Sequence, residues 1–422
     1  MRCRNFEEFR TQLEHRHTRA PFKKAACGLE ILVYKTLDEF DLAEWNGVVN
    51  DDSIFLHTDY IEAMIKSYDG GLEYRFVRFL DRGELVGVAA LQITHFETAD
   101  LSRNMKSGSL LGFFSRKISS GSNTLKYNVL ICGNAFASGE HGFKFEAKIS
   151  EAQTFSAILE AVDLIKEEDN DGDKKISACL LKDYYPESFK NTYMFVDEKY
   201  SEFLVDPNMI MPVRPEWNSF DDYLHSLTSK YRTKAKAAYK RSKEIDLRTM
   251  TAEDMETHRE DFMKLYNQVH YKADFRIGTL NFDAFLNYRK ALGDRFLLKG
   301  LFLNGRLVAF MSGFKYDSML DAHFVGIDYE HNYEYALYSR MLYEYIDEAI
   351  QRGVSKISFG RTAMEIKSTV GAFPVDLKIF IKHRSKTPNN LLRLLFSYVK
   401  PADFDQRVPY KKTILQDMRT LV

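Results

Sequence analysis

The sequence is poor in cysteine, in long apolar runs and in excess charge of either sign. Its four cysteines, Cys3, Cys27, Cys132 and Cys179, lie far apart and form no C-x-x-C pair, which argues against a zinc ribbon and against a secreted disulfide scaffold. Lys and Arg number 59 and Asp and Glu number 60, so no bulk electrostatic field attracts the chain to nucleic acid or membrane. Any basic binding site must therefore be local.

The sequence also lacks the apolar runs that are typical of targeting and membrane-spanning segments. Glu7 and Glu8 stand where a signal peptide needs an apolar run, and no stretch approaches the roughly 20 apolar residues that span a bilayer. We therefore expect a cytoplasmic protein without a membrane span. With 422 residues, of which 45% are hydrophobic and 28% charged, the chain is expected to form two globular domains.

The first half of the chain shows strand and helix signals in a definite order. A capping box, Ser150-x-x-Gln153, opens the clearest helix. Asp81-Arg82-Gly83 has the turn chemistry of a hairpin. The predicted elements are a strand at 31–34, helices near 38–45 and 59–67, strands at 73–80, 84–94 and 128–132, a helix from 150 and a strand at 175–181.

The second half repeats this order, and Asn304-Gly305 gives it an equally clear hairpin turn. Its predicted elements are a strand at 247–250, helices at 254–266 and 282–292, strands at 296–303, 306–314 and 319–327, a long helix at about 333–351, and strands at 356–359 and 375–381. The repetition indicates an internal duplication. The seam is expected in Val205–Glu216, where Pro207, Pro212 and Pro215 favour an extended connector.

These signals predict five segments: a lead-in (1–29), a first domain (30–205) that serves as a scaffold or acceptor-binding lobe, a connector (206–218), a second and catalytic domain (219–386), and a C-terminal tail (387–422).

The order of elements resembles the GNAT acyltransferase fold, and two such units in one chain resemble the Fem-type peptidyltransferases and other FemAB-like proteins. The string Gly353–Thr362, followed by Ile366-Lys367 and Gly371-Ala372, is similar to one that these relatives carry late in their second domain. The basic segment Ser219–Lys243 also resembles one of their helices. The likeness covers about 30–385 in architecture and 219–385 in motifs. It implies an α/β fold class with α+β mixed sheets, tandem GNAT-like domains and N-acyltransferase activity.

One segment departs from the superfamily pattern. Acetyl-CoA users bring a glycine-bearing loop to the start of the long helix, where backbone N–H groups hold the pyrophosphate. Here Asp328–Ala336 contains no glycine and three acids, which disfavours ordinary acetyl-CoA. A change from the Fem-type Phe-Lys to Ile366-Lys367 is minor. The resemblance implies a donor substrate, acyl-CoA or aminoacyl-tRNA, rather than a tightly bound cofactor, and the sequence leaves the choice open.

The candidate catalytic residues are Lys367, Arg361, His323 and Glu365. Lys367 and Arg361 follow a strand at the end that faces the cleft in this topology, where their charges would stabilise an oxyanion or a phosphate. Glu365 would pair with Lys367 or take a proton from the amine. His323 would act as a base or polarise a carbonyl; a packed histidine is the alternative.

The candidate donor-binding residues are Val325, Gly326, Ile327, Tyr335, Tyr338 and Gly360. The first three lie where the strand before the long helix is expected to splay and expose backbone N–H groups, although a glycine at a bulge is an equal alternative for Gly326. Tyr335 and Tyr338 would donate to a leaving group or pack in the core. The expected acceptor is a small-molecule or peptide amine, and we expect no metal site.

A polyanion site is predicted on the basic helix, from the residues Lys230, Arg232, Lys234, Lys236, Lys240 and Arg241. Their spacing around an apolar seam predicts an amphipathic helix suited to tRNA or another phosphate-bearing partner, or simply a solvated face. The main alternative to an enzyme is a catalytically silent GNAT-derived module that binds such a partner or a protein. A DNA-binding protein is disfavoured by the net charge of −1.

Overall fold

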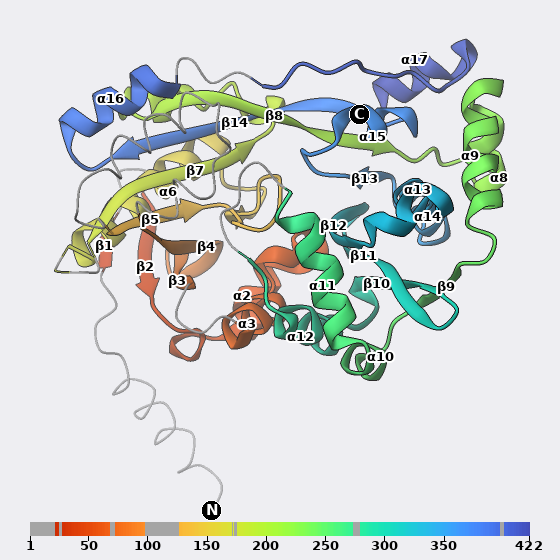
Figure 1. Ribbon diagram of the computed structural model, residues 1–422. Helices are drawn as coiled ribbons and strands as arrows, with labels where there is room; N and C mark the ends of the chain where they lie inside the picture. Colours follow the sequence, from red (N-terminus) through yellow and green to blue (C-terminus); the bar gives the residue numbers. More distant parts are fainter. Residues whose placement is uncertain are drawn as a thin grey trace, which may run out of the picture.

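The structure is a computed structural model, and one mixed β-sheet passes through the whole molecule with helices packed against it (Figure 1). The residues that the structure describes are 22–24, 28–67, 72–97, 126–170, 172, 175–272, 279–396 and 401–422. Most of the predicted lead-in, 1–29, lies outside the described residues. Its described part contains strand β1 (Phe22–Lys24).

The first unit has the predicted order of elements. It consists of β2 (Glu30–Tyr34), α2 (Leu42–Val49), α3 (Thr58–Ser67), β3 (Leu72–Asp81), β4 (Glu84–Glu97), β5 (Lys126–Cys132), β6 (Phe143–Phe145), α6 (Glu151–Glu168), β7 (Ile176–Tyr184), α7 (Tyr193–Asp197) and β8 (Ser201–Pro212). The predicted capping box forms: Ser150 Oγ accepts from the Gln153 N–H at 3.3 Å, and α6 starts at the next residue.

The second unit follows two helices, α8 (Phe220–Ser226) and α9 (Ser229–Arg241). It consists of β9 (Asp246–Thr249), α10 (Ala252–Thr257), α11 (Arg259–His270), α12 (Phe282–Leu292), β10 (Phe296–Leu303), β11 (Arg306–Tyr316), β12 (Met319–Ile327), α13 (Tyr329–Tyr335), α14 (Leu337–Gln351), β13 (Lys356–Ser358), α15 (Met364–Thr369) and β14 (Phe373–His383). The helices α16 (Lys386–Phe396) and α17 (Lys412–Thr420) come last.

Two turns show how local chemistry sets the element boundaries. Asn304 and Gly305 both have positive φ, 51° and 80°, as the type of two-residue hairpin turn that their sequence favours requires. The long helix was predicted to start at about residue 333, and this start is wrong: α14 begins at Leu337. Ala336 takes a left-handed conformation with φ of 51° and separates α13 from α14. The Asn332 side chain then accepts from the Tyr338 N–H at 2.9 Å and satisfies a donor in the first turn of α14.

The strand order reads almost the same from both ends. It runs β2-β3-β4-β5-β7-β14 and then β8-β13-β12-β11-β10-β9, with β1 added beside β2. Within each half one pair is parallel, β5 with β7 and β12 with β13. The last strand of each unit lies in the other half: β14 pairs with β7 of the first unit, and β8 pairs with β13 of the second. The two units are therefore joined by an exchange of strands.

Alternate residues of the central strands face two different cores. Phe76 and Phe310 point to a core that α2, α3, α11 and α12 cover, and this core contains residues of both units. In it the ring of Tyr60 stacks on that of Tyr288, with centroids 5.1 Å apart. On the other face, α6 covers the core of the first unit and α14 that of the second. The shared core is a second reason why the units form one body.

The predicted connector, 206–218, needs a correction. Its first half is the end of β8: Pro207 lies where the pairing of β8 with β14 shifts register, and Pro212 is the last residue of the strand, so the missing N–H groups are tolerated. The tail is also structured in its described part. Tyr410 and Met418 are buried in the core of the second unit, and the Tyr410 hydroxyl donates to the Gly371 carbonyl at 3.1 Å.

Among the described residues, no helix has the length and apolar character that crossing a bilayer requires.

Candidate active site

The parallel strands β12 and β13 separate from each other at the middle of the second unit. They pair from Met319 with Lys356 to Asp321 with Ser358, and β12 then continues to Ile327 without β13 beside it. A register shift against β11 also bulges β12 around His323 and Phe324. In the first unit the corresponding pair, β5 and β7, stays paired to Cys132 at the end of β5. The splay is a property of the second unit.

Two buried ionisable side chains lie where the strands part. Lys367 of α15 and Asp321 of β12 are each 4% exposed. Burial lowers the pKa of Lys367 to about 7, although the charge of Asp321 opposes the shift. Burial likewise raises the pKa of Asp321 to about 7, against the hydrogen bond from Ser358 and the charge of Lys367. Both pKa values are shifted toward neutrality by burial, as is common for residues of functional sites.

Backbone and side-chain contacts hold this pair in place. Lys367 Nζ donates to the Gly360 carbonyl at 3.3 Å. The Ser358 hydroxyl accepts from Asn208 Nδ2 at 3.1 Å, and the same amide group lies 2.9 Å from the Tyr185 hydroxyl. Asn208 and Tyr185 come from the first unit, so the surroundings of the pair include both halves of the molecule.

Arg361 reaches the same region from the loop after β13. Its Nη1 lies 3.3 Å from the Asp183 carboxylate at the end of β7, and Asp183 also binds the neighbouring Lys182. The structure thus brings Lys367 to the carbonyl of Gly360, the residue before Arg361, and the part that these residues play in a reaction stays a prediction. Sequence reasoning gave no role to Asp321, Lys182 or Asp183. The sequence does contain a signal that could have found these three residues: charged residues within strands that are otherwise apolar. The two stretches are Leu-Leu-Lys-Asp-Tyr and Met-Leu-Asp-Ala-His.

Glu365 does not pair with Lys367, and this expectation is corrected. Two residues apart on α15, their side chains point to different sides of the helix. Glu365 is exposed and binds Arg407 of the tail, with Oε1 2.6 Å from Nη2.

His323 lies among aromatic rings rather than beside Lys367. Its ring centroid is 4.4 Å from that of Phe324 and 4.9 Å from that of Phe314. Burial lowers the pKa of His323 to about 3, so its imidazole is neutral at pH 7. Within the described part of the chain Nε2 has no hydrogen-bond partner. His323 thus occupies the position expected of a packed histidine, which was the alternative to a catalytic base.

The expected donor-binding residues lie along the splayed part of β12 and the start of α14. Val325 and Ile327 are in the stretch without β13. Gly326 has a packing reason of its own: a Cβ would stand 2.2 Å from the Phe310 ring and 2.8 Å from Leu265 Cβ. Tyr338 is part of the packing around the core of the second unit, as is Tyr335. Burial raises the pKa of the Tyr338 phenol above its ordinary range.

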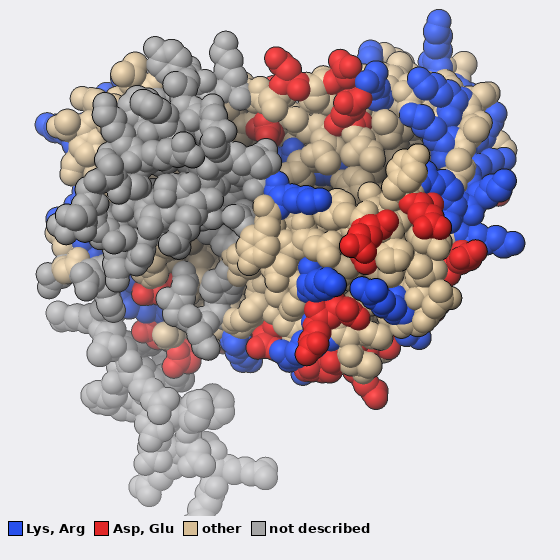
Figure 2. Space-filling view, in the orientation of Figure 1, with Lys and Arg blue, Asp and Glu red and all other residues tan. Residues whose placement is uncertain are grey.

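The helix α9 forms the predicted amphipathic surface. Tyr231, Ala235 and Ala238 are buried in the second core. Arg232 is half-buried, and the remaining predicted bases are exposed: Lys230, Lys234, Lys236, Lys240 and Arg241. Figure 2 shows Lys and Arg gathered on this side of the molecule, over α9 and the neighbouring elements. Arg241 Nε donates to the Glu334 carbonyl at 3.0 Å, so the basic helix adjoins α13 at the approach to the long helix.

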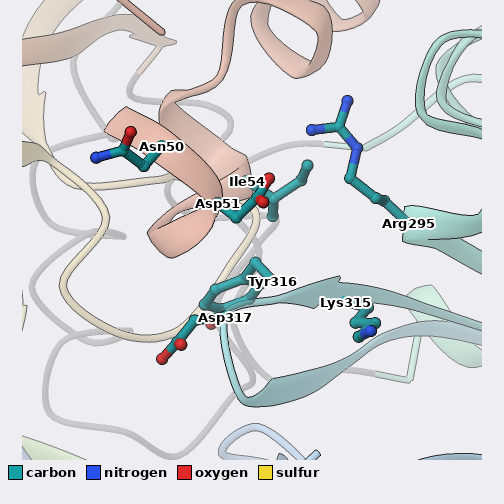
Figure 3. A pocket seen from close by; sticks show the side chains of 7 residues that line it. All are labelled: Asn50, Asp51, Ile54, Arg295, Lys315, Tyr316 and Asp317. Atoms are coloured by element: carbon teal, nitrogen blue, oxygen red, sulfur yellow. The ribbon is translucent and has the colours of Figure 1, made fainter. Parts of the chain in front are cut away.

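A pocket of about 170 Å³ opens at the seam of the two units (Figure 3). Asn50, Asp51 and Ile54 of the first unit face Tyr316 and Asp317 of the second, with Arg295 and Lys315 completing the lining. Tyr316 lies near enough to Asp321 for that carboxyl, together with burial as the main cause, to raise the pKa of its phenol. Among the described residues no group of three or more His, Cys, Asp or Glu is placed to hold a metal ion.

The mixed sheet, the splay before a long helix and the duplicated order of strands define the class of protein as a GNAT-fold transferase with tandem units. Residues 229–368, from α9 into α15 of the second unit, match the family model described as Acetyltransferase (GNAT) domain, and the chain is similar to that family over this range. No curated protein matches this chain in sequence.

Solved structures agree at the level of the fold. The structure is similar to that of FemX, at 13% identity and a TM-score of 0.52, over 84% of this chain and 98% of that one. Matches at lower TM-scores include L-PGS from Bacillus licheniformis (10% identity, TM-score 0.48, over 85% of this chain and 97% of that one) and a tandem GNAT protein from the clavulanic acid biosynthesis pathway (8% identity, TM-score 0.47, over 85% and 99%). The chain is thus FemAB-like in its fold.

Proposed function

We propose that the protein is an N-acyltransferase that moves an acyl or aminoacyl group from an activated donor to a primary amine, with its reaction centre in the second unit. The observation that carries the proposal is the splay of β12 from β13, which begins at Asp321, one member of the buried pair of Lys367 and Asp321. The first unit has neither a splay at its parallel pair nor a match to the family model.

The chemistry needs three groups at this place. The amine nitrogen must lose a proton, attack the donor carbonyl and form a C–N bond while the bond to the leaving group breaks. Asp321 or neutral Lys367 would accept the amine proton and return it to the departing thiolate or ribose oxygen. Arg361 and the free N–H groups of the splayed strand would stabilise the oxyanion of the tetrahedral intermediate. The products are an amide and the protonated leaving group.

The donor that the surroundings favour is an aminoacyl-tRNA rather than acetyl-CoA. The short helix α13 occupies the segment where a pyrophosphate loop would lie, and the Asn332 side chain already binds the Tyr338 N–H. Beside it, α9 presents a row of exposed lysines that suits a phosphodiester backbone. The proposed acceptor is a small-molecule or peptide amine.

Filter binding of charged tRNA, beside calorimetry with acetyl-CoA and long-chain acyl-CoA, tests the donor. We expect tRNA retention that weakens with salt and falls about tenfold in Lys234→Glu/Lys236→Glu, because two phosphate contacts are lost. The matched control Lys264→Glu/Lys290→Glu reverses two exposed lysines on α11 and α12 and should bind like the parent chain. Tight acyl-CoA binding without tRNA retention would reject the aminoacyl-tRNA donor, and mass spectrometry of the amine product tests transfer.

A catalytically silent binding module is the second candidate, and the deep burial of Lys367 and Asp321 supports it. It predicts that Lys367→Ala and Arg361→Ala keep the cellular phenotype, whereas charge reversal along 230–243 abolishes it. Loss of the phenotype in a folded Lys367→Ala variant would count against this candidate.

A further inference from the structure

Asp183, at the end of β7, is a fully buried carboxylate that contacts both units. Its Oδ2 binds Lys182 Nζ and accepts from the Gly139 N–H at 3.3 Å, and its Oδ1 lies 3.3 Å from Arg361 Nη1. Burial by itself would raise the pKa of Asp183, but Lys182 and Arg361 outweigh it and keep the pKa below its usual value. The carboxylate is therefore ionised and cross-links the first unit to the loop after β13.

The backbone at Asp183 is held in an unfavourable conformation. Its φ is 64°, in the left-handed region, which residues other than glycine seldom adopt although asparagine and aspartate tolerate it best, and which costs about 1 kcal/mol or more. The structure keeps this conformation at the point where β7 ends and the carboxylate turns toward the second unit. Lys182 Nζ is fixed in turn by the Ala137 carbonyl at 2.7 Å.

Arg361 is held on one side and open on the other. Its side chain is 25% exposed, and Asp183 is the one ion-pair partner it has among the described residues. The preceding residue, Gly360, has a φ of 75°, and its carbonyl accepts from the Met209 N–H at 3.2 Å and from Lys367 Nζ at 3.3 Å. The loop is thus fixed from β8, α15 and β7 at once. The N–H groups of the Arg361 guanidinium that do not face Asp183 remain available to a ligand.

Arg361 brings a permanent positive charge to this cluster. The one carboxylate that binds it, Asp183, also binds Lys182, whose pKa burial lowers, and Asp321 lies within electrostatic range of Lys182. A guanidinium in a largely buried place stabilises negative charge that develops on a bound group. Arg361 lies next to the pair of Lys367 and Asp321, since the carbonyl of the preceding residue, Gly360, accepts from Lys367 Nζ.

We propose that Asp183 of the first unit is a positioning residue of the reaction centre: it holds Arg361 of the second unit so that the guanidinium faces the oxyanion of the donor carbonyl. The inference rests on the proposed function and changes one part of it. The first unit is then more than a scaffold or an acceptor lobe, because the reaction centre is incomplete without its carboxylate.

A double-mutant cycle tests the inference. Asp183→Asn, Arg361→Gln and the double variant are compared in amide formation from charged tRNA and a primary amine. We expect Asp183→Asn to lower kcat about 10- to 100-fold with little change in KM for the amine, because it loosens a group that acts on the transition state. The double variant should lose no more than Arg361→Gln alone, because the carboxylate acts only through the guanidinium.

The chain offers a matched control in Asp169. This aspartate is equally buried and lies between Arg75 and Lys35, at 2.7 and 3.8 Å, but within the first unit. Asp169→Asn should lose stability and keep its kcat per folded molecule. Should Asp183→Asn fail to fold, Lys182→Met/Asp183→Asn removes both buried charges and takes its place in the cycle.

Each outcome decides the point. Losses that multiply in the double variant, or a kcat unchanged in folded Asp183→Asn, would overturn the inference. A readout independent of activity is the NMR signal of the Arg361 Nη1–H groups, which contact Asp183, identified by its loss in Arg361→Gln. Faster solvent exchange of this signal in Asp183→Asn would support the positioning role of Asp183. If no donor reacts but the exchange is faster, the proposed function fails and the positioning role stands. Unchanged exchange would overturn the inference.

Discussion

At the scale of single residues, the molecule removes charged groups from water at one place. Lys367, Asp321, Lys182 and Asp183 are all nearly inaccessible to solvent. Lys182 and Asp183 are adjacent in β7 and bind each other, Arg361 also binds Asp183, and Asp321 and Lys367 lie within electrostatic range of each other. Burying such groups costs several kcal/mol per ion in a folded protein unless it is offset by pairing. A chain under selection for stability alone has apolar alternatives of the same volume, so the cluster is better explained by chemistry than by packing.

The amine of Lys367 makes stability depend on pH in a predictable direction. Because burial lowers its pKa to about 7, the unfolded chain binds a proton between pH 7 and 10.5 that the folded chain does not. Folding is therefore disfavoured as pH falls through this window, by up to about 1.4 kcal/mol per pH unit. In Lys367→Met the effect is absent, so its stability relative to the parent should rise by about 2–3 kcal/mol from pH 9.5 to 7.5.

Urea unfolding of the two chains at both pH values measures this difference, in which the titrating groups that do not interact with Lys367 cancel; Asp321→Asn in both chains removes the one that does. A stability gap that does not change with pH would show that the Lys367 ammonium stays charged inside the protein.

At the scale of elements, the described tail completes the second unit. Tyr410 forms a bridge with Leu227 before α9, and its ring lies against Phe373 at the start of β14. Arg407 binds Glu365 and so fastens the tail to α15, the helix that carries Lys367. The tail thus borders α15, the helix of the proposed reaction centre, on its outer side.

Gly371→Ala tests the contact between the tail and the second unit. Gly371 has a φ of 110°, and an added Cβ would stand 1.9 Å from the Tyr410 hydroxyl, so the variant combines backbone strain with a clash against the tail. We expect a loss of about 3 kcal/mol or more in the free energy of unfolding. The matched control Gly83→Ala has a similar φ of 85° with open space around it, and should lose only about 1 kcal/mol.

Denaturant titration of both variants gives the comparison. Equal losses would mean that strain alone decides and that the tail moves aside without cost. In a Tyr410→Ala background, Gly371→Ala should cost less than it does in the parent chain, because the clash is then removed.

At the scale of the whole molecule, the exchange of β8 and β14 makes each half incomplete without the other. A fragment that ends before β14 would lack the strand between β7 and β8 and expose two unpaired sheet edges. We expect the full chain to unfold in one cooperative transition, with coincident midpoints from far-ultraviolet and near-ultraviolet signals. Two transitions at separate denaturant concentrations would contradict this expectation and show independent units.

How far the sequence predicts this protein follows from the range of the interactions involved. The hairpin turn at Asn304-Gly305, the capping box at Ser150 and the buried seam of α9 depend on neighbours in the chain, and all three were predicted and confirmed. The break at Ala336 was missed, because the side chain of Asn332 and the contact from Arg241 set it. Motif resemblance located Arg361 and Lys367, whose use in catalysis stays a prediction.

The sequence by itself determined the order of elements, the duplication and the amphipathic faces, since these are written in local periodicity and turn chemistry. Only the tertiary structure decided that β8 and β14 change halves, that Asp321 lies beside Lys367, and that Asp183 meets Arg361. Strand partners distant in the sequence are selected by how well whole faces pack together. No short stretch of residues records that choice.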